Sequence, residues 1–207
     1  IELARQILSD HCTPKRLRAL ELEGGPRFDR VLWRQPAEAG LVAAGVPEAQ
    51  GGAGLGFLVV AGIVEQVGRT AAPVPLLETS VLGALPLAKF GSAALCEAWL
   101  PRVARGEAVL TAALVEAERE PEQPGTHAVR DGDGWRLSGK KICVPAGPVA
   151  DAFLVPAALE GGGVAVFLVE AGAAGVSQEP LATTSRQPES VLELRDARVG
   201  PGALVGT

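Results

Sequence analysis

The hydrophobic pattern changes its period near residue 108, and this change constrains the fold more than any other feature of the sequence. Before it, apolar residues recur at the three- and four-residue spacing of a helix, as in residues 58–67. After Gly106 the spacing moves toward two, and turn signals recur about every ten residues. The sequence therefore predicts an α+β multidomain chain, with an all-α helical bundle over residues 1–108 and an antiparallel β-barrel or sandwich over residues 109–207.

Capping residues and glycines mark the ends of the expected helices. Thr13 reads as an N-cap, and Pro14 then occupies the first helical position, where proline is well tolerated. Pro36 should bend or split the next helix, because its ring removes a backbone donor. Residues 76–89 are expected to form another helix, and Ser92 is expected to cap the last one.

A hairpin is the clearest strand signal in the second half. The segments 128–130 and 135–137 flank Asp131-Gly132-Asp133-Gly134, whose Asp-Gly steps favour the positive φ values of a tight turn. Further strands are expected at residues 153–155, 164–169 and 191–194. These short strands and their turns support the barrel or sandwich.

Composition excludes several kinds of partner. The 207 residues carry a net charge of −5, and the Lys and Arg residues are scattered, so no basic stripe is available for nucleic acid. The longest uncharged stretch, residues 51–64, contains five glycines and is too short for a membrane span. The start of the chain lacks the pattern of a secretory signal, so the expected location is the cytoplasm.

The cysteines give no sign of a metal centre. Cys12, Cys96 and Cys143 lie far apart in the sequence, without any CxxC pair, and only His11 and His127 could complete a ligand set. A partly exposed helix end is the simpler interpretation of the adjacent His11 and Cys12. We therefore expect no metal site.

Several dispersed segments resemble one family in their order and spacing. They are residues 33–41, residues 46–56 with their glycine-rich loop, Glu65-Gln66-Val67-Gly68-Arg69, residues 99–107, residues 131–141 with Ala150-Asp151, and residues 194–199. Together they resemble the helical first domain and the β-barrel second domain of the acyl-CoA dehydrogenases. The resemblance reaches nearly the whole chain but only these two of the family's three domains.

The resemblance implies an FAD-dependent oxidoreductase that dehydrogenates an acyl-CoA thioester between its α and β carbons, in fatty acid or sterol side-chain degradation. The family's catalytic glutamate belongs to its C-terminal helical domain, so no catalytic residue is expected within these 207 residues. The implied ligands are FAD and an acyl-CoA. The implied assembly is a homo-oligomer or a hetero-oligomer with another acyl-CoA dehydrogenase subunit.

The family's flavin-contacting segments are altered in this sequence. The matching cofactor-binding positions are Leu114, Val115 and Gly125 in the first segment, and Cys143, Val144 and Pro145 in the second. Val115 stands where the family has a threonine, Cys143 where it has an aromatic residue, and Pro145 where it has a hydroxyl. Residues 118–122 also add three glutamates near the expected pyrophosphate, which they would repel.

These replacements leave two main hypotheses open. The chain is either a working FAD-dependent subunit that holds flavin through backbone amides and apolar contacts, or a catalytically degenerate partner of a paralogue that carries the flavin and the base. A third hypothesis is a protein that binds acyl-CoA without oxidising it. Losing several flavin contacts predicts weakened or lost FAD binding in this chain.

Overall fold

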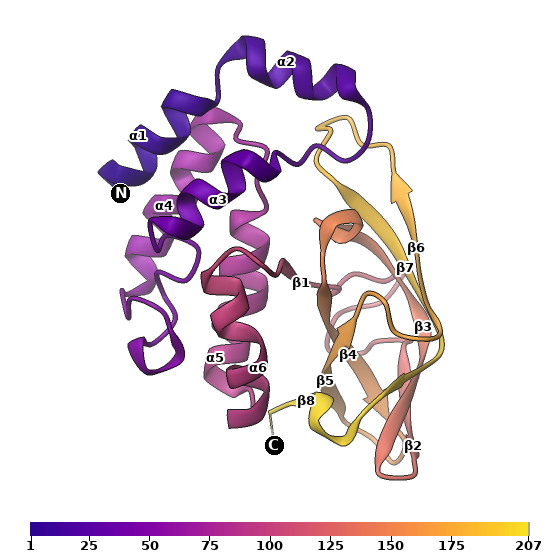
Figure 1. Ribbon diagram of the computed structural model, residues 1–207. Helices are drawn as coiled ribbons and strands as arrows, with labels where there is room; N and C mark the ends of the chain where they lie inside the picture. The colour runs from indigo at the N-terminus through magenta and orange to yellow at the C-terminus, as the bar shows by residue number, and fades with distance from the viewer. Residues whose placement is uncertain (207) are drawn as a thin grey trace.

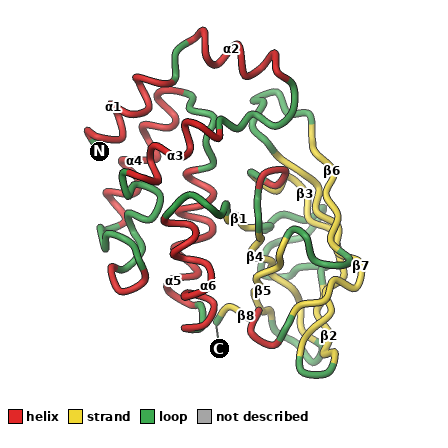
Figure 2. Tube along the Cα trace, viewed as in Figure 1, coloured by secondary structure: helices red, strands yellow, loops and turns green. Residues whose placement is uncertain are grey.

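The computed structural model describes residues 1–206 and places a helical layer beside a curved β-sheet (Figure 1). The helices come from the first half of the chain and the strands from the second half, as the separation of helix and strand in Figure 2 shows. The predicted α+β class and the order of its two parts are confirmed. The last long helix ends at Ala104 and the first strand begins at Leu110, and the division into two domains at residue 108 stays a prediction.

The helical elements are α1 (Glu2–His11), α2 (Pro14–Glu23), α3 (Arg30–Glu38), the 3₁₀ turn η1 (Glu48–Gln50), α4 (Phe57–Thr70), the π-helix η2 (Glu78–Ala84), α5 (Leu85–Phe90) and α6 (Ala93–Ala104). The strands are β1 (Leu110–Ala112), β2 (His127–Asp131), β3 (Gly134–Pro145), β4 (Ala152–Leu159), β5 (Val164–Glu170), β6 (Val176–Leu181), β7 (Glu189–Val199) and β8 (Leu204–Val205). Two further 3₁₀ turns are η3 (Gly147–Val149) and η4 (Pro201–Ala203).

Both predicted caps are present. The Thr13 hydroxyl accepts the N–H of Arg16 at 3.2 Å, and the Ser92 hydroxyl accepts the N–H of Leu95 at 3.2 Å. Of the two effects expected of Pro36, a split does not occur, because α3 runs unbroken from Arg30 to Glu38, and a bend stays a prediction. Pro36 lacks only the one backbone donor that would bond the carbonyl of Leu32 in the preceding turn.

The expected regular helix over residues 76–89 contains a wider turn. Residues Glu78–Ala84 form the π-helix η2, which leads directly into α5. The spacing of apolar residues over one or two turns does not distinguish a π-helical turn from an α-helical turn. The sequence therefore could not predict η2. Inside it, Ser80 is buried and its hydroxyl donates to the carbonyl of Val42 at 2.6 Å.

The sheet is mixed and does not close into a barrel, which corrects the barrel alternative and the purely antiparallel pairing of the expected β-barrel or sandwich. Its eight strands follow the order β6-β7-β3-β2-β4-β5-β8, with β1 attached to β4, so β6 and β8 remain unpaired ends. Both β1 and β2 pair with β4 in parallel. The predicted hairpin is confirmed as the antiparallel pair β2–β3. Alternation alone shows that a segment is a strand but does not show its direction relative to non-consecutive neighbours.

Two β-bulges explain where the alternation in the second half breaks. In the β3–β7 pair the register shifts between Lys141 and Val144, and the bulged residue Cys143 has φ +50°. It also shifts opposite Ser138, where Asp196 on β7 has φ +50° and its N–H donates to the Ser138 hydroxyl. An extra residue at a bulge reverses the side-chain alternation beyond it. Lys141 and Val144 can therefore both point into the core.

The helical layer and the sheet meet closely at Gly83 and β1. A β-carbon at Gly83 would lie 2.4 Å from Cβ of Leu110 and 3.1 Å from its carbonyl carbon. Nearby, the indole N–H of Trp33 donates to the carbonyl of Gly106 at 3.0 Å, which ties α3 to the segment entering β1. The absence of a side chain at position 83 thus sets how closely η2 approaches the sheet.

Replacing Gly83 with Ala is expected to destabilise the protein by about 1–3 kcal/mol, because the added methyl group overpacks the contact with Leu110. Gly68→Ala in α4 is the matched control, since a β-carbon there meets nothing within 4 Å. It should stabilise the protein by about 0.5–1 kcal/mol through helix propensity. Urea unfolding of the two variants and the wild type measures both effects. Equal stability of the two variants would contradict the close contact.

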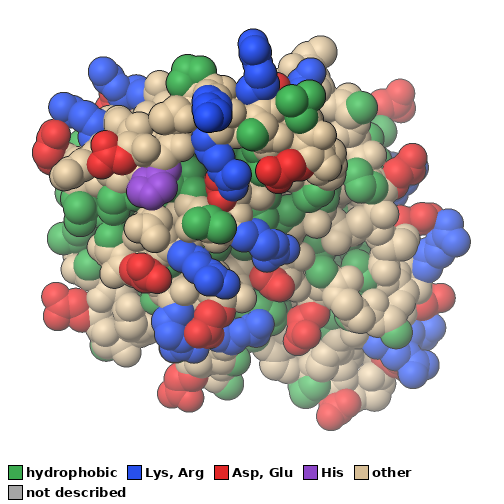
Figure 3. Space-filling model, turned by 45° about the horizontal axis from the view of Figure 1, so that its top comes forward, with side chains coloured by type: hydrophobic (Ala, Val, Ile, Leu, Met, Phe, Trp, Pro, Cys, Tyr) green, Lys and Arg blue, Asp and Glu red, His purple; other side chains and the backbone are tan. Residues whose placement is uncertain are grey.

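Charges of both signs interleave on the surface. The face shown in Figure 3 carries Lys and Arg side chains mixed with Asp and Glu. Among residues 1–206, no helix is both long enough and apolar enough to cross a bilayer.

Candidate functional site

The structure brings the two candidate cofactor-binding segments together. The first leaves β1 at Ala112, and the second is the end of β3. The N–H of Ile142 donates to the carbonyl of Val115 at 2.8 Å, and the Thr111 hydroxyl donates to the carbonyl of Pro145 at 2.7 Å. Two bonds therefore hold the segments side by side, although Thr111 and Pro145 are 34 positions apart in the sequence.

A buried ion pair lies behind these segments. The Lys141 ammonium donates to Glu116 Oε1 at 2.6 Å and to the carbonyl of Pro156 at 2.8 Å. The lysine side chain is 0% exposed and that of Glu116 is 8% exposed. The other carboxylate oxygen, Oε2, accepts the N–H of Gly125 at 2.7 Å, and Oε1 accepts the N–H of Thr126 at 3.0 Å. Glu116, which lies on the first segment, is thus bonded both to the loop that precedes β2 and to Lys141 on β3.

Opposing effects set the pKa values of this pair. Burial raises the pKa of Glu116. The hydrogen bonds from Lys141 and Thr126 together lower this pKa by more than burial raises it, so the net shift is downward. Burial lowers the pKa of Lys141, and Glu116 only partly offsets this. The ammonium and the carboxylate lie 2.6 Å apart as an ion pair, in which each supplies the counter-ion that the other requires in a site with little water.

The candidate positions differ in exposure. Leu114 and Val115 are 38% and 45% exposed, and Gly125 and Cys143 are also exposed. Pro145 is half-buried, whereas the Val144 side chain points into the core and is 1% exposed. The bulge produces this difference between neighbours, because it turns Cys143 outward and Val144 inward.

The exposed side chains do not match the polar edge of a flavin. An isoalloxazine ring presents carbonyl oxygens and ring nitrogens, which need hydrogen-bond donors, and a flat face that favours an aromatic neighbour. Val115 and Pro145 carry no side-chain donor, and Cys143 offers only a weak thiol donor. The side chains at these positions therefore do not fit the ring, and only backbone groups remain to bind it.

The loop after Glu116 adds negative charge next to the first candidate cofactor-binding segment. Glu118, Glu120 and Glu122 are all exposed, and Glu118 has φ +57°. A pyrophosphate placed near this loop would meet three carboxylates and one cation, Arg119, so the net charge of residues 118–122 would repel it.

The cysteines and histidines lie in different surroundings. Cys96 is buried, and its thiol donates to the carbonyl of Leu87 at 3.3 Å, while Cys12 is half-buried and Cys143 exposed. His11 Nδ1 lies 2.8 Å from the carbonyl of Ile7, one helical turn earlier. Within residues 1–206, no group of three or more His, Cys, Asp or Glu side chains is placed to hold a metal ion.

The ion pair itself was not predicted from the sequence, although a signal for it exists. Trp135, Leu137 and Lys141 occupy alternate positions of one strand, and all three are buried. A lysine on the inward face of a strand requires a buried carboxylate or carbonyl partner. The identity of that partner depends on the loop after β1, whose path the sequence did not reveal.

Comparisons with known proteins point to one family. Residues 1–107 match the family model described as acyl-CoA dehydrogenase, N-terminal domain. The acyl-CoA dehydrogenase FadE27 of Mycobacterium tuberculosis is 42% identical over 205 residues, which cover 99% of this chain and 53% of FadE27. The chain therefore spans about half the length of this curated relative.

Solved structures share the fold over the whole chain. The ChsE4–ChsE5 complex from Mycobacterium tuberculosis superimposes with a TM-score of 0.92 at 41% identity, covering 99% of this chain and 55% of that one. A variant of the Tcur3481–Tcur3483 steroid ACAD gives a TM-score of 0.91 at 44% identity, with the same coverage. An acyl-CoA dehydrogenase from Bacillus anthracis complexed with FAD gives 0.88 at 28% identity, covering all of this chain and 36% of that one.

Proposed function

This chain belongs to the acyl-CoA dehydrogenase family, and we propose that it is the partner subunit of a heteromeric acyl-CoA dehydrogenase. In this proposal a paralogous chain carries the working flavin and the base that removes the α proton. The present chain contributes its conserved architecture to the assembly and does not hold FAD tightly in its own site. No acidic residue among these 207 is proposed as the base.

The replaced side chains at the flavin-side segments are the observation that carries this proposal. Val115, Cys143 and Pro145 lie on two segments that hydrogen bonds hold together, so the replacements affect one place. Each lost hydrogen bond to a buried group costs about 1 kcal/mol, and lost stacking costs a similar amount. Losses of this size at one site weaken binding by about a hundredfold.

The assembly is proposed from the relatives. The relative ChsE4–ChsE5 is described as a complex of two components. The steroid ACAD Tcur3481–Tcur3483 is likewise named after two components. By analogy, we propose a second acyl-CoA dehydrogenase chain as the partner. Because one of these relatives is a steroid ACAD, we propose the CoA thioester of a bulky, sterol-derived acid as the substrate class.

A second candidate function is supported by the preserved scaffold. The pair formed by Glu116 and Lys141 still fixes both flavin-side segments, and Glu116 itself takes the N–H of Gly125. A chain of this kind could hold FAD through backbone amides and act as a complete dehydrogenase subunit. The solved relative from Bacillus anthracis shows FAD in this fold.

Flavin content separates the two candidates. The full-length protein, purified alone and then dialysed against FAD, is expected to stay colourless, whereas its complex with a co-expressed partner should show flavin absorbance and oxidise an acyl-CoA. The partner purified alone serves as the control for flavin that it contributes. A yellow, fully active homo-oligomer of this chain would support the second candidate and reject the first.

A further inference from the structure

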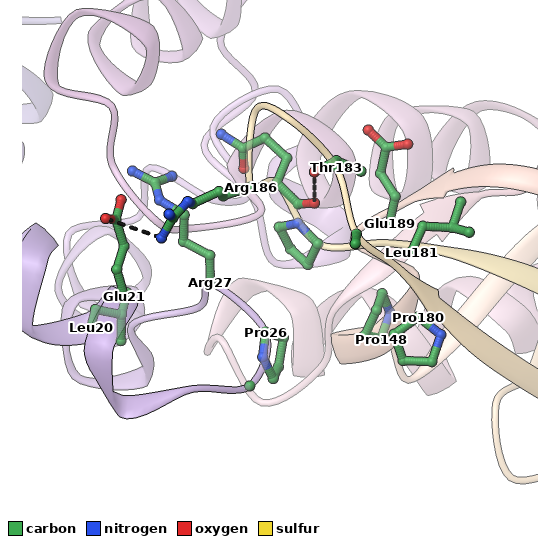
Figure 4. A pocket seen from close by; sticks show the side chains of 14 residues that line it. Leu20, Glu21, Pro26, Arg27, Pro148, Pro180, Leu181, Thr183, Arg186 and Glu189 are labelled. Atoms are coloured by element: carbon green, nitrogen blue, oxygen red, sulfur yellow. Dashed lines mark hydrogen bonds and ion pairs between the residues drawn. The ribbon is translucent and has the colours of Figure 1, made fainter.

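A separate pocket lies between the helical layer and the far end of the sheet. It has a volume of about 580 Å³ and is formed by the end of α2, the segment between α2 and α3, and the loop between β6 and β7 (Figure 4). None of the candidate flavin-side residues lines it. A volume of this size is within the range of small-molecule sites, about 300–1,000 Å³. We call it the Arg27 pocket, after the residue that gives it charge.

One nitrogen of the Arg27 guanidinium group lacks a hydrogen-bond acceptor among the described residues. Its Nη2 donates to the carbonyl of Ala71 at 2.6 Å, which fixes the guanidinium group. Its Nη1 is buried and has no hydrogen-bond partner among residues 1–206. A buried charged donor without an acceptor is costly, so a ligand oxygen that displaced the atoms covering Nη1 and reached it from the pocket would be stabilised there.

A second arginine approaches from the opposite wall. Arg186 lies on the β6–β7 loop, and its Nη1 is 3.3 Å from Glu21 Oε2 on α2. Figure 4 shows the side chains of Arg27 and Arg186 extending toward Glu21, while Glu189 points away from them. Two guanidinium groups and one carboxylate give this end of the pocket a net charge of about +1. It suits an oxyanion, because guanidinium groups bind carboxylate and phosphate oxygens well.

Besides the polar side chains of Thr183, Gln187 and Glu189, the rest of the lining is apolar and includes several prolines. Pro26 comes from the helical side, and Pro148 and Pro180 come from the sheet side (Figure 4). Leu20 and Leu181 complete the apolar surface. Proline rings lose little conformational freedom when a ligand covers them, so these walls favour a compact apolar body.

We propose that the Arg27 pocket binds a small molecule in which one oxyanion is attached to a compact apolar body. The oxyanion lies against Arg27 and Arg186, and the apolar body lies against the prolines. This site is distinct from the flavin-side segments and needs neither flavin nor catalysis. It offers the protein a place where an organic acid could be sensed or retained.

The test uses cyclohexanecarboxylate, cyclohexylmethanol and inorganic phosphate as probes of the full-length protein, with ligand-detected NMR and equilibrium dialysis as the measurements. Cyclohexanecarboxylate should bind and the neutral alcohol should not, because only the acid satisfies Arg27. Phosphate should compete with the acid but bind more weakly, because it lacks the apolar body. Equal binding of acid and alcohol, or tighter binding of phosphate than of the acid, would overturn the proposal.

Variants locate the site. Arg27→Met and, on the other wall, Arg186→Met should each lower the affinity for cyclohexanecarboxylate by about tenfold or more, because each removes a charged hydrogen-bond donor. Arg195→Met is the control, since Arg195 is an exposed arginine that pairs with Glu193 on β7 and does not line the pocket. Circular dichroism checks that every variant is folded. Undiminished binding in both pocket variants, or an equal loss in the control, would reject the site.

Discussion

Replacing Glu116 with Gln is expected to lower the free energy of unfolding by about 3–5 kcal/mol, because it leaves Lys141 buried without its counter-ion. The lysine side chain is 0% exposed, and the partners that remain, the carbonyl of Pro156 and the new amide oxygen at position 116, carry no charge. Since most small proteins are stable by about 5–15 kcal/mol, this is a large fraction of the total. Urea unfolding at neutral pH, followed by circular dichroism, measures the change.

Two further variants identify the cause of this loss. Adding Lys141→Met to Glu116→Gln should recover most of the lost stability, because the unpaired buried charge is gone. Glu193→Gln removes a carboxylate from the exposed pair with Arg195 and should leave the unfolding midpoint unchanged. If Glu116→Gln proved as harmless as this surface change, the pair would not hold the segments together.

The pH dependence of stability should change as well. The pKa of Glu116 lies below its usual value of 4.5, so its contribution is present above that pH and is lost as the pH falls through the folded-state pKa. Glu116→Gln should remove this part of the acid sensitivity. Its Lys141, with a lowered pKa and no counter-ion, should make the variant regain stability as the pH rises toward 10.5.

Restoring the family's side chains at the flavin-side segments is the other change with a large expected effect. The triple variant Val115→Thr, Cys143→Trp and Pro145→Thr should raise the affinity of this chain for FAD by about a hundredfold, because two hydrogen bonds and one stacking contact are added. Equilibrium dialysis of the full-length protein against FAD measures the gain.

The matched control changes the same positions without adding a side-chain donor or a ring, and it gains the same backbone N–H at position 145 as the triple variant. Val115→Ala, Cys143→Ala and Pro145→Ala should leave FAD affinity at the wild-type level. Cys143 already has φ +50° on a β-bulge, so alanine and tryptophan meet the same backbone conformation there. If wild type and both variants bound FAD equally well, the replaced side chains would not be the reason for weak binding.

The α+β class and the position at which helices give way to strands follow from local chemistry. Capping by Thr13 and Ser92, and the Asp-Gly turn between β2 and β3, depend on neighbouring residues only, so the sequence predicts them correctly. The open, mixed sheet depends on pairings between distant strands, such as β1 with β4. Alternation does not carry that information, and for this reason the sequence left barrel and sandwich open and did not predict the parallel pairings.

The candidate site shows a similar division. The family resemblance pointed to two segments, and the structure places them side by side through the N–H of Ile142 and the carbonyl of Val115. Residue order did not reveal that a bulge turns Cys143 outward and Val144 inward. Nor did it reveal the pairing of Lys141 with Glu116, because both the bulge and the pair depend on the register between strands and on the path of a loop.

The ratio of flavin to protein chains in the purified heteromeric complex tests the proposed function most directly. Denaturing the complex, measuring released FAD by its absorbance and counting each chain by quantitative mass spectrometry gives this ratio. If this chain is the partner subunit, released FAD should match the number of paralogous chains and not the sum of both chains. One FAD for every chain, including this one, would contradict the account.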